Sequence, residues 1–239
     1  MKSISIQWTP DVEPSEAEMV VASVAHLQEV MMVLGQHAGL SLTRPQIRPF
    51  GTWVIPSVKE GSPYWSTLWY VQRSFDPARG QISGPRFIDV IRNEPWQQAG
   101  PHFDIAVVDA DLVDAEPHNV PGIDRAYALT ATEPNLACVL SVYRLRRLSD
   151  NTDRRLALRR VALQGFGRVL QLPSPQRIES VEDTRGLRHC TNVCLMRDAP
   201  DAESALRLAR EETAARIMLC RACTNDLLDH VVQTHFSPN

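Results

Sequence analysis

The sequence predicts an α/β (α+β) fold in which helices flank a mixed, twisted sheet. Short apolar runs typical of strands alternate along the chain with longer segments whose apolar residues recur at helical spacing. The order is strand, helix, strand, helix, three strands and helix, followed by a cysteine-containing tail. With 239 residues, 44% of them hydrophobic, the chain can form one large domain or one domain with a small appendage. We expect an N-terminal subdomain over 1–172 and a C-terminal subdomain over 173–239.

The individual elements are predicted from apolar periodicity and from the prolines and glycines that interrupt it. Polar and apolar residues alternate over 4–8, which indicates a strand, and Pro14 then opens an amphipathic helix that runs to Gly35 or Gly39. Residues 57–72 match no regular pattern. The other predicted elements are a strand over 53–55, a turn over 74–81, a helix over 85–93, strands over 103–108, 125–129 and 136–143, a helix over 150–172, a polar loop over 174–185 and a helix over 202–218.

The charge balance argues against nucleic-acid and membrane partners. The formal net charge is −3, and no basic run is long enough to follow a phosphate backbone. No stretch approaches the roughly 18 consecutive apolar residues of a membrane span, and acidic residues follow the first strand too closely for a signal peptide. We therefore expect a cytoplasmic protein; the sequence carries no signal for its oligomeric state. In a reducing compartment, clustered cysteines are more often metal ligands than disulfides.

Four of the five cysteines form two close pairs, Cys190 with Cys194 and Cys220 with Cys223. Two such pairs brought together by a turn place four thiolates at the corners of a tetrahedron, which is the coordination of a structural zinc. The alternatives are ordinary buried cysteines or a redox-active pair at Cys220 and Cys223. A redox CxxC follows a strand and opens a helix, whereas this pair is expected to close the chain after a helix. We therefore favour a structural zinc site.

The cysteine segment resembles the end of the catalytic domain of archaemetzincins, zinc metallopeptidases of the metzincin clan. Gly-Leu-Arg-His-Cys over 186–190 is followed by Cys194, Met196 and the final CxxC, as in that family. The resemblance implies a metzincin-like mixed sheet flanked by helices, with a small zinc-stabilised C-terminal segment. It also implies that Met196 corresponds to the Met-turn residue beneath the catalytic zinc. Further segments similar to that family lie upstream, in the same order, at 4–8, 75–81, 107–112 and 137–144.

The helix HExxHxxGxxH, which binds the catalytic zinc of an active metzincin, has no counterpart in this chain. One alignment follows the active-site-type helix, predicted over 152–172 within the helical stretch that starts at 150. It places Gln164, Gly165 and Arg168 at the positions of the first His, the catalytic Glu and the second His. His189, the third ligand position, then lies beyond an insertion. We prefer this alignment because the predicted helix has the length and pattern of the active-site helix.

A second alignment runs back from 186–190 without a gap. It places Glu179, Asp183 and His189 at the three ligand positions, and Ser180 at the position of the catalytic Glu. These positions fall in a polar segment just after a proline-rich stop. Both alignments lose the carboxylate that would activate a zinc-bound water.

Two functions follow from the lost motif. The first is a non-proteolytic pseudopeptidase that keeps the structural zinc and binds a peptide or protein, for example along an edge strand. The second is a divergent enzyme, either a metalloenzyme with a second metal at Glu179, Asp183 and His189 or an enzyme that acts on a different substrate with Arg168 as an anion anchor. Arg168 would place a guanidinium where the zinc would lie and could bind a substrate carboxylate through two hydrogen bonds; a surface arginine on an arginine-rich helix is the alternative reading of Arg168. In the metal set, Glu179 and Asp183 come first along the chain. The first two would share one face of a helix at a spacing of four, although such pairs are usually solvated.

Overall fold

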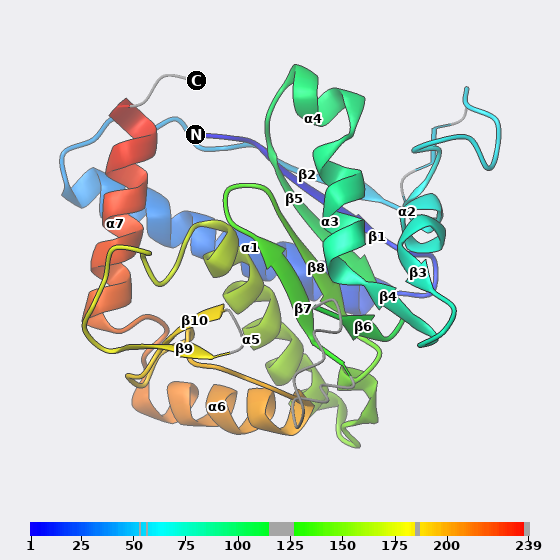
Figure 1. Cartoon of the computed structure of the whole chain (residues 1–239). Helices are drawn as coiled ribbons and strands as arrows, with labels where there is room; N and C mark the ends of the chain where they lie inside the picture. Colours follow the sequence, from blue (N-terminus) through cyan, green and yellow to red (C-terminus); the bar gives the residue numbers. More distant parts are fainter. Residues whose placement is uncertain (53, 56, 115–126, 185–186, 237–239) are drawn as a thin grey trace.

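A central sheet of five strands organises the fold (Figure 1). The computed structural model describes residues 1–52, 54–55, 57–114, 127–184 and 187–236. Four neighbouring strands run parallel, and the fifth, at one edge, runs antiparallel. The sheet is therefore mixed, as the sequence predicts. In spatial order its strands are β2 (Ile47–Gly51), β1 (Ile4–Trp8), β5 (Phe103–Val108), β8 (Ala137–Ser141) and β7 (Thr130–Glu133).

Helices cover both faces of the sheet (Figure 1). Alternation along β5 divides the core in two: Ile105 and Val107 belong to one hydrophobic cluster, and Ala106 and Val108 belong to the other. Because both of its faces are covered, β5 consists of six buried residues in succession. The first cluster lies under α1 (Pro14–His37) and α5 (Asn151–Val169), and the second lies under α2 (Thr67–Ser74) and α3 (Gly84–Arg92).

The last third of the chain packs on the side of the sheet that α1 and α5 cover. Helix α6 contacts α5, and helix α7 contacts α1. Leu206, Leu227 and Val231 share the hydrophobic core of α1 and α5, and the division of the chain at residue 172 stays a prediction. The remaining elements are β3 (Phe75–Asp76), β4 (Gln81–Ser83), α4 (Pro95–Ala99), β6 (Leu112–Val113), a 3-10 helix (Leu145–Arg147), β9 (Val181–Thr184), β10 (Leu187–Cys190), α6 (Ala202–Ala215) and α7 (Arg221–Phe236).

Arg146 lies across the carboxyl ends of β1 and β5. Its guanidinium donates to Asp109 and to Glu16, in each case at 2.6 Å, and to the carbonyl of Asp11 at 2.8 Å. The backbone N–H of Asp109 in turn donates to Thr9 Oγ1 at 3.2 Å. One arginine therefore joins the end of β5, the loop after β1 and the first turn of α1.

Most of the predicted elements are confirmed, but two strand predictions and one loop prediction were wrong. Val54 forms only a single bridge, to Ser66, and Trp53 lies outside the described residues. The strand of this region is β2, an edge strand that carries a proline and exposed side chains and so lacks polar–apolar alternation. Residues 125–126 also lie outside the described part, and β7 begins only at Thr130. The polar loop predicted over 174–185 contains β9.

Among the described residues, α1 alone has the length and hydropathy of a membrane-crossing helix. Its mean hydropathy over 18 residues is 1.4, which corrects the expectation that no segment approaches a membrane span. In the structure, 44% of that window is buried, against the sheet, α5 and α7. A core helix of a globular protein has the same length and composition, so the hydropathy of α1 does not distinguish a membrane from a protein core.

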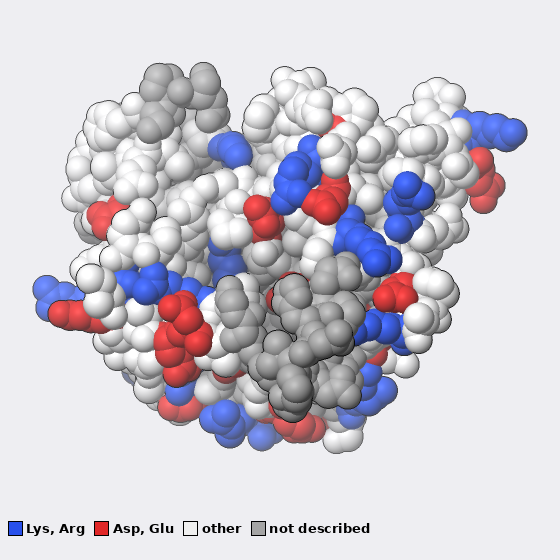
Figure 2. Space-filling view, in the orientation of Figure 1, with Lys and Arg blue, Asp and Glu red and all other residues white. Residues whose placement is uncertain are grey.

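Charges of both signs share the surface shown in Figure 2. Basic and acidic side chains are interspersed over the described residues of this face, and no continuous basic patch forms there. Charged side chains also pair within the described residues, as in Arg197 with Glu211 at 2.9 Å and Arg210 with Asp153 at 2.6 Å. This face lacks the basic stripe that is typical of nucleic-acid binding.

We predict that the docking of α7 makes stability depend on pH through His230. This histidine is 9% exposed, and burial lowers its pKa to about 4. Because an unperturbed histidine titrates near pH 6.5, the unfolded chain binds this proton at a higher pH than the folded chain does. The contribution of neutral His230 to the free energy of unfolding is therefore complete above about pH 6.5 and is lost as the pH falls toward 4. The loss lowers the free energy of unfolding by an amount on the order of 3 kcal/mol.

The check is urea denaturation of the wild type and His230→Gln between pH 4 and 7. The variant should show a flatter dependence of the free energy of unfolding on pH. His235→Gln, an exposed position on the same helix, should keep the wild-type dependence. Identical curves for the wild type and His230→Gln would contradict the prediction.

Candidate functional site

The four paired cysteines meet in one cluster. Cys190 ends β10, Cys194 lies in the turn that follows, Cys220 directly precedes α7, and Cys223 lies in its first turn. Their four sulfur atoms all lie within 4.8 Å of one another, and the Sγ atoms of Cys190 and Cys220 are 3.6 Å apart. A disulfide would bring two sulfurs to about 2.05 Å, so these are free thiols. Such a cluster could hold a metal ion, and three of its four members are buried.

Backbone hydrogen bonds hold the two cysteine pairs together. The N–H of Cys190 donates to the carbonyl of Met196 at 2.9 Å, which closes the turn that carries Cys194. The N–H of Leu195 donates to the carbonyl of Met218 at 2.8 Å, and this bond links the turn to the segment before α7. The pairs are therefore positioned by the chain itself.

Three hydrogen-bond donors face the sulfur atoms. The backbone N–H of Cys220 lies 3.4 Å from Cys194 Sγ, Asn192 Nδ2 lies 3.6 Å from Cys220 Sγ, and Arg177 Nη1 lies 3.3 Å from Cys223 Sγ. Donors of this kind stabilise thiolates, the form in which cysteine binds metals. Hydrogen bonds with the Cys194 and Cys223 thiols also lower the pKa of Cys190 well below its ordinary value. Asn192 and Arg177 carry no sequence signal for this role.

The position of the CxxC pair corrects one expectation. Cys220 and Cys223 do not close the chain, because α7 begins at Arg221 and continues for 16 residues. The pair opens a helix, as a redox-active CxxC does, but it follows the loop after α6 and not a strand. Its sulfurs also lie beside those of Cys190 and Cys194, which an isolated redox pair would lack.

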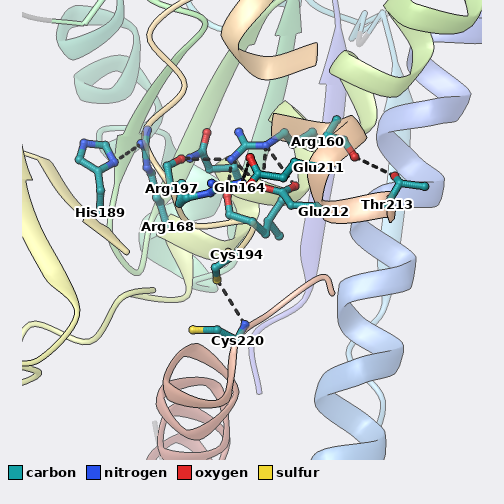
Figure 3. Close-up of polar contacts among 12 residues, drawn as sticks. Arg160, Gln164, Arg168, His189, Cys194, Arg197, Glu211, Glu212, Thr213 and Cys220 are labelled. Carbon is teal, nitrogen blue, oxygen red and sulfur yellow. Dashed lines mark hydrogen bonds and ion pairs between the residues drawn. The ribbon is translucent and has the colours of Figure 1, made fainter. Parts of the chain in front are cut away.

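The positions singled out by the alignment along α5 lie close to His189 (Figure 3). Arg168 Nη2 is 3.1 Å from His189 Nδ1, although the two residues are 21 positions apart in the chain. Gln164, one helical turn before Arg168, is buried and donates to the carbonyl of Arg197. Helix α5 and strand β10 thus bring two of the three ligand positions of that alignment, Arg168 and His189, into contact.

Close packing determines which side chains fit at two glycine positions of α5. A Cβ added at Gly165 would lie 2.6 Å from Cys138 Sγ, so this position has no room for a side chain, least of all a carboxylate. A Cβ at Gly167 would lie 2.8 Å from the sulfur of Met196. Met196 is fully buried against this turn of the helix, next to Arg168.

The second alignment predicts a ligand set that the structure does not bring together. Glu179 is exposed in a turn, and Asp183 lies on β9, where its side chain is 71% exposed and faces Arg188. His189 is fully buried. The expected helix is absent because β9 and β10 form an antiparallel hairpin here. Within the described ranges, this set is not among the groups of side chains that could share a metal ion.

Arg160 is a buried charge that sequence reasoning missed. It is 2% exposed and donates through Nε to both carboxylate oxygens of Glu212, at 3.1 and 3.2 Å. Its Nη2 reaches the carbonyls of Leu195 and Arg197. Burial lowers the pKa of Arg160 and raises that of Glu212, and the pair joins α5 to α6 beside the cysteine turn. In the sequence, Arg160 looks like one more arginine of a polar helix face.

Comparisons of the chain with protein-family models, with curated proteins and with solved structures found no match. The resemblance to archaemetzincins therefore stays a prediction, and the site is interpreted from its own geometry.

We predict that Cys220→Ser removes the metal held by the cysteine cluster. Loss of one of four ligands should abolish tight binding and lower the free energy of unfolding by several kcal/mol, because metal affinity contributes directly to folding. Elemental analysis and chemical denaturation measure the two effects. Cys138→Ala is the matched control, since Cys138 is buried beneath α5 and lies outside the cluster. A Cys220→Ser protein with the metal content of the wild type would show that the cluster is not the metal site.

Proposed function

We propose that this chain is a non-proteolytic, archaemetzincin-like protein that binds a carboxylate of a peptide or protein through Arg168. The observation that carries the proposal is the 3.1 Å contact between Arg168 and His189. In the alignment along α5, these residues occupy the second and third ligand positions of the family's zinc site. Their side chains meet as two ligands of one metal would, but the guanidinium of Arg168 stands in place of one of the two ligands.

The surroundings of Arg168 favour an anionic ligand. Its Nε atom is buried without a hydrogen-bond partner, and its Nη1 reaches Thr130 Oγ1 only at 3.5 Å. No ion pair to Arg168 occurs within the described part of the chain; Asp114 and Asp198 act on it only through longer-range attraction. A buried charge without a partner is costly, whereas a carboxylate could accept two parallel hydrogen bonds from a guanidinium.

The neighbouring strand suggests how a peptide would lie. Arg168 contacts Thr130, the first residue of β7, and β7 is the antiparallel edge of the central sheet. An extended peptide can add to such an edge through main-chain hydrogen bonds. A carboxylate of that peptide would then be within reach of the guanidinium.

The same region argues against peptidase chemistry. A zinc peptidase needs a carboxylate that takes a proton from the metal-bound water. The corresponding position is Gly165, where Cys138 leaves no room for a side chain. The competing hypothesis, a second metal at Glu179, Asp183 and His189, gains no support because two of these residues are exposed.

For the cysteine cluster we propose zinc as the metal. Zn–S bonds of about 2.3 Å in a tetrahedron place neighbouring sulfurs about 3.8 Å apart. The 3.6 Å between Cys190 and Cys220 is close to that value. Four thiolates without an open position are typical of a structural zinc. Its role here would be to fix α7 and the turn over 190–197 against α5.

We predict that Arg168→Ala abolishes peptide binding. The test uses immobilised full-length protein, a pool of synthetic peptides with free carboxylates and the same pool with its carboxyl groups amidated. The wild type should retain members of the first pool only. Arg168→Ala should reduce their retention at least about tenfold, since truncating one partner of a buried charge pair typically costs 2–5 kcal/mol. Arg168→Lys should also lose binding, because an ammonium lacks the planar fork.

Arg155→Ala is the control, since Arg155 is exposed on the same helix. Equal retention by the wild type and Arg168→Ala would reject the anchor, and a wild type that retains neither pool would reject peptide binding. Protein supplied with zinc should leave casein intact. Cleavage that stops on addition of a chelator would contradict the non-proteolytic assignment.

We further predict that zinc is the metal retained after purification without added metal and dialysis against a weak chelator. Elemental analysis should find zinc that is present in the wild type and in Cys138→Ala but lost from Cys220→Ser. If the analysis finds iron in place of zinc, and this iron is also lost from Cys220→Ser, the proposal of zinc is contradicted. The cysteine cluster would still be the metal site.

A further inference from the structure

A second group of metal-ligating side chains lies on the other face of the sheet, in the core under α2 and α3. Glu94, His102 and Asp104 each offer one ligand atom, and these atoms all lie within 4.8 Å of one another. The three side chains are almost completely buried, with exposures of 0%, 8% and 2%. Asp104 belongs to β5, Glu94 directly precedes α4, and His102 lies in the loop between α4 and β5. Sequence spacing assigns no role to His102, because the group is assembled only by the fold.

The carboxylate of Glu94 is held at one oxygen and unpartnered at the other. Tyr70, from α2, donates its hydroxyl to Glu94 Oε1 at 2.6 Å. Glu94 Oε2 is buried and accepts no hydrogen bond of good geometry. Burial and repulsion from Asp104 raise the pKa of Glu94 to about 8, although hydrogen bonds from Tyr70 and from the indole of Trp96 favour its charged form. A fully buried carboxylate oxygen without a partner is rare and costly in a native structure.

Outer partners also orient the two other candidate ligands. His102 Nδ1 lies 2.8 Å from the carbonyl of Gly100, so Nδ1 carries a proton and donates to that oxygen. Nε2, the other ring nitrogen, lies 3.1 Å from Asp104 and would offer a lone pair to a cation when the ring is neutral. Gln97 Nε2 donates to Asp104 Oδ2 at 3.4 Å, and it also binds the carbonyl of His102 at 3.0 Å. Metal-binding histidines and carboxylates usually carry outer partners of this kind, which fix the ring tautomer and the direction of each ligand.

The group consists of two acidic side chains and one imidazole. Two carboxylates share a buried site, and His102 is the sole ion-pair partner of either within the described residues. No lysine or arginine pairs with them in that part of the chain. Buried charges in proteins are normally paired or coordinate a metal.

We propose that Glu94 Oε2, His102 Nε2 and a carboxylate oxygen of Asp104 bind one divalent first-row cation, such as Mn²⁺ or Zn²⁺. His102 Nε2 and Asp104 Oδ2 are 3.1 Å apart, close to the edge of about 3.3 Å in a tetrahedron with bonds of about 2.0 Å. Imidazole and carboxylate ligands suit these cations, whereas four thiolates select zinc. The site is independent of the cysteine cluster, because the two lie on opposite faces of the sheet.

A groove on the surface lies near Glu94. The groove has a volume of about 590 Å³ and is lined by residues that include Tyr64, Trp69 and Asn93. Asn93 precedes Glu94 in the chain. The ring of Tyr64 lies 5.9 Å from that of Tyr70 and 5.6 Å from that of Trp96, measured between centroids. Tyr64 thus links the groove to Tyr70, whose hydroxyl binds Glu94.

The test is a titration of the full-length, chelator-treated protein with Mn²⁺, with the free ion measured by electron paramagnetic resonance. Manganese is chosen because it prefers carboxylate ligands to thiolates. The wild type should bind one Mn²⁺ per chain, and Glu94→Gln should weaken binding by more than tenfold. Tyr70→Phe, which removes an outer partner and keeps all three ligands, should weaken binding by about tenfold. Cys220→Ser should bind Mn²⁺ as the wild type does, which separates this site from the cysteine cluster.

Asp89→Asn is the matched control, since Asp89 is an exposed carboxylate on α3. The main competing explanation is a proton shared between the two carboxylates. In that case the wild type binds no Mn²⁺, its melting temperature does not respond to the ion, and Glu94→Gln, which mimics a protonated acid, is at least as stable as the wild type. That result, or equal Mn²⁺ affinity in the wild type and Glu94→Gln, overturns the proposal. Circular dichroism shows whether each variant is folded.

Discussion

The rest of the structure depends on how closely helix α5 approaches the sheet. Gly165 allows α5 to lie against Cys138 of β8, and Gly167 allows Met196 to lie against the other side of the same turn. A side chain at either position would force the helix away from its neighbours. Because α5 is covered on both sides, its polar residues cannot all face solvent. Gln164 and Arg160 are carried into the interior, and the tail of the chain has to provide their partners.

The tail meets this requirement with main-chain carbonyls and one carboxylate. Arg160 binds Glu212 of α6 and the carbonyls of Leu195 and Arg197, and Gln164 binds the latter carbonyl as well. A buried ion pair of this kind adds little net stability over apolar packing, but loss of one partner leaves an uncompensated charge. The turn over 190–197 is therefore held from two directions, by the polar side chains of α5 and by the cysteine cluster. Two donors of this helix, Arg160 Nη1 and Arg168 Nε, remain buried without a described group that accepts from them.

The sequence was sufficient for the parts of the fold that show regular periodicity, and less so elsewhere. Strands β1, β5 and β8 and helices α1, α3, α5 and α6 have apolar patterns that match their burial, and the convergence of the four cysteines followed from their spacing. β2 was missed because an exposed edge strand with a proline has no alternation. Helix α7 was missed because the CxxC pair was expected to end the fold.

The burial of charges could not be predicted, since the same arginine suits a solvated helix face and a core. The group of Glu94, His102 and Asp104 shows the same difficulty: its members come from the residue before α4, a loop and β5, and no local pattern marks them. Their proximity is a property of the tertiary fold alone.

The contacts of Arg146 decide one further property of the sheet. In open α/β sheets, ligands usually bind in the crevice between the carboxyl ends of two strands whose connections leave in opposite directions, with phosphates at the following helix N-terminus. Here the strand order places that crevice between β1 and β5. It is filled by the guanidinium of Arg146, and the first turn of α1 presents the carboxylate of Glu16, which binds the N–H of Glu13 at 3.0 Å. An internal carboxylate paired with Arg146 thus lies at the helix N-terminus, where sheets with this change of strand direction often hold a phosphate.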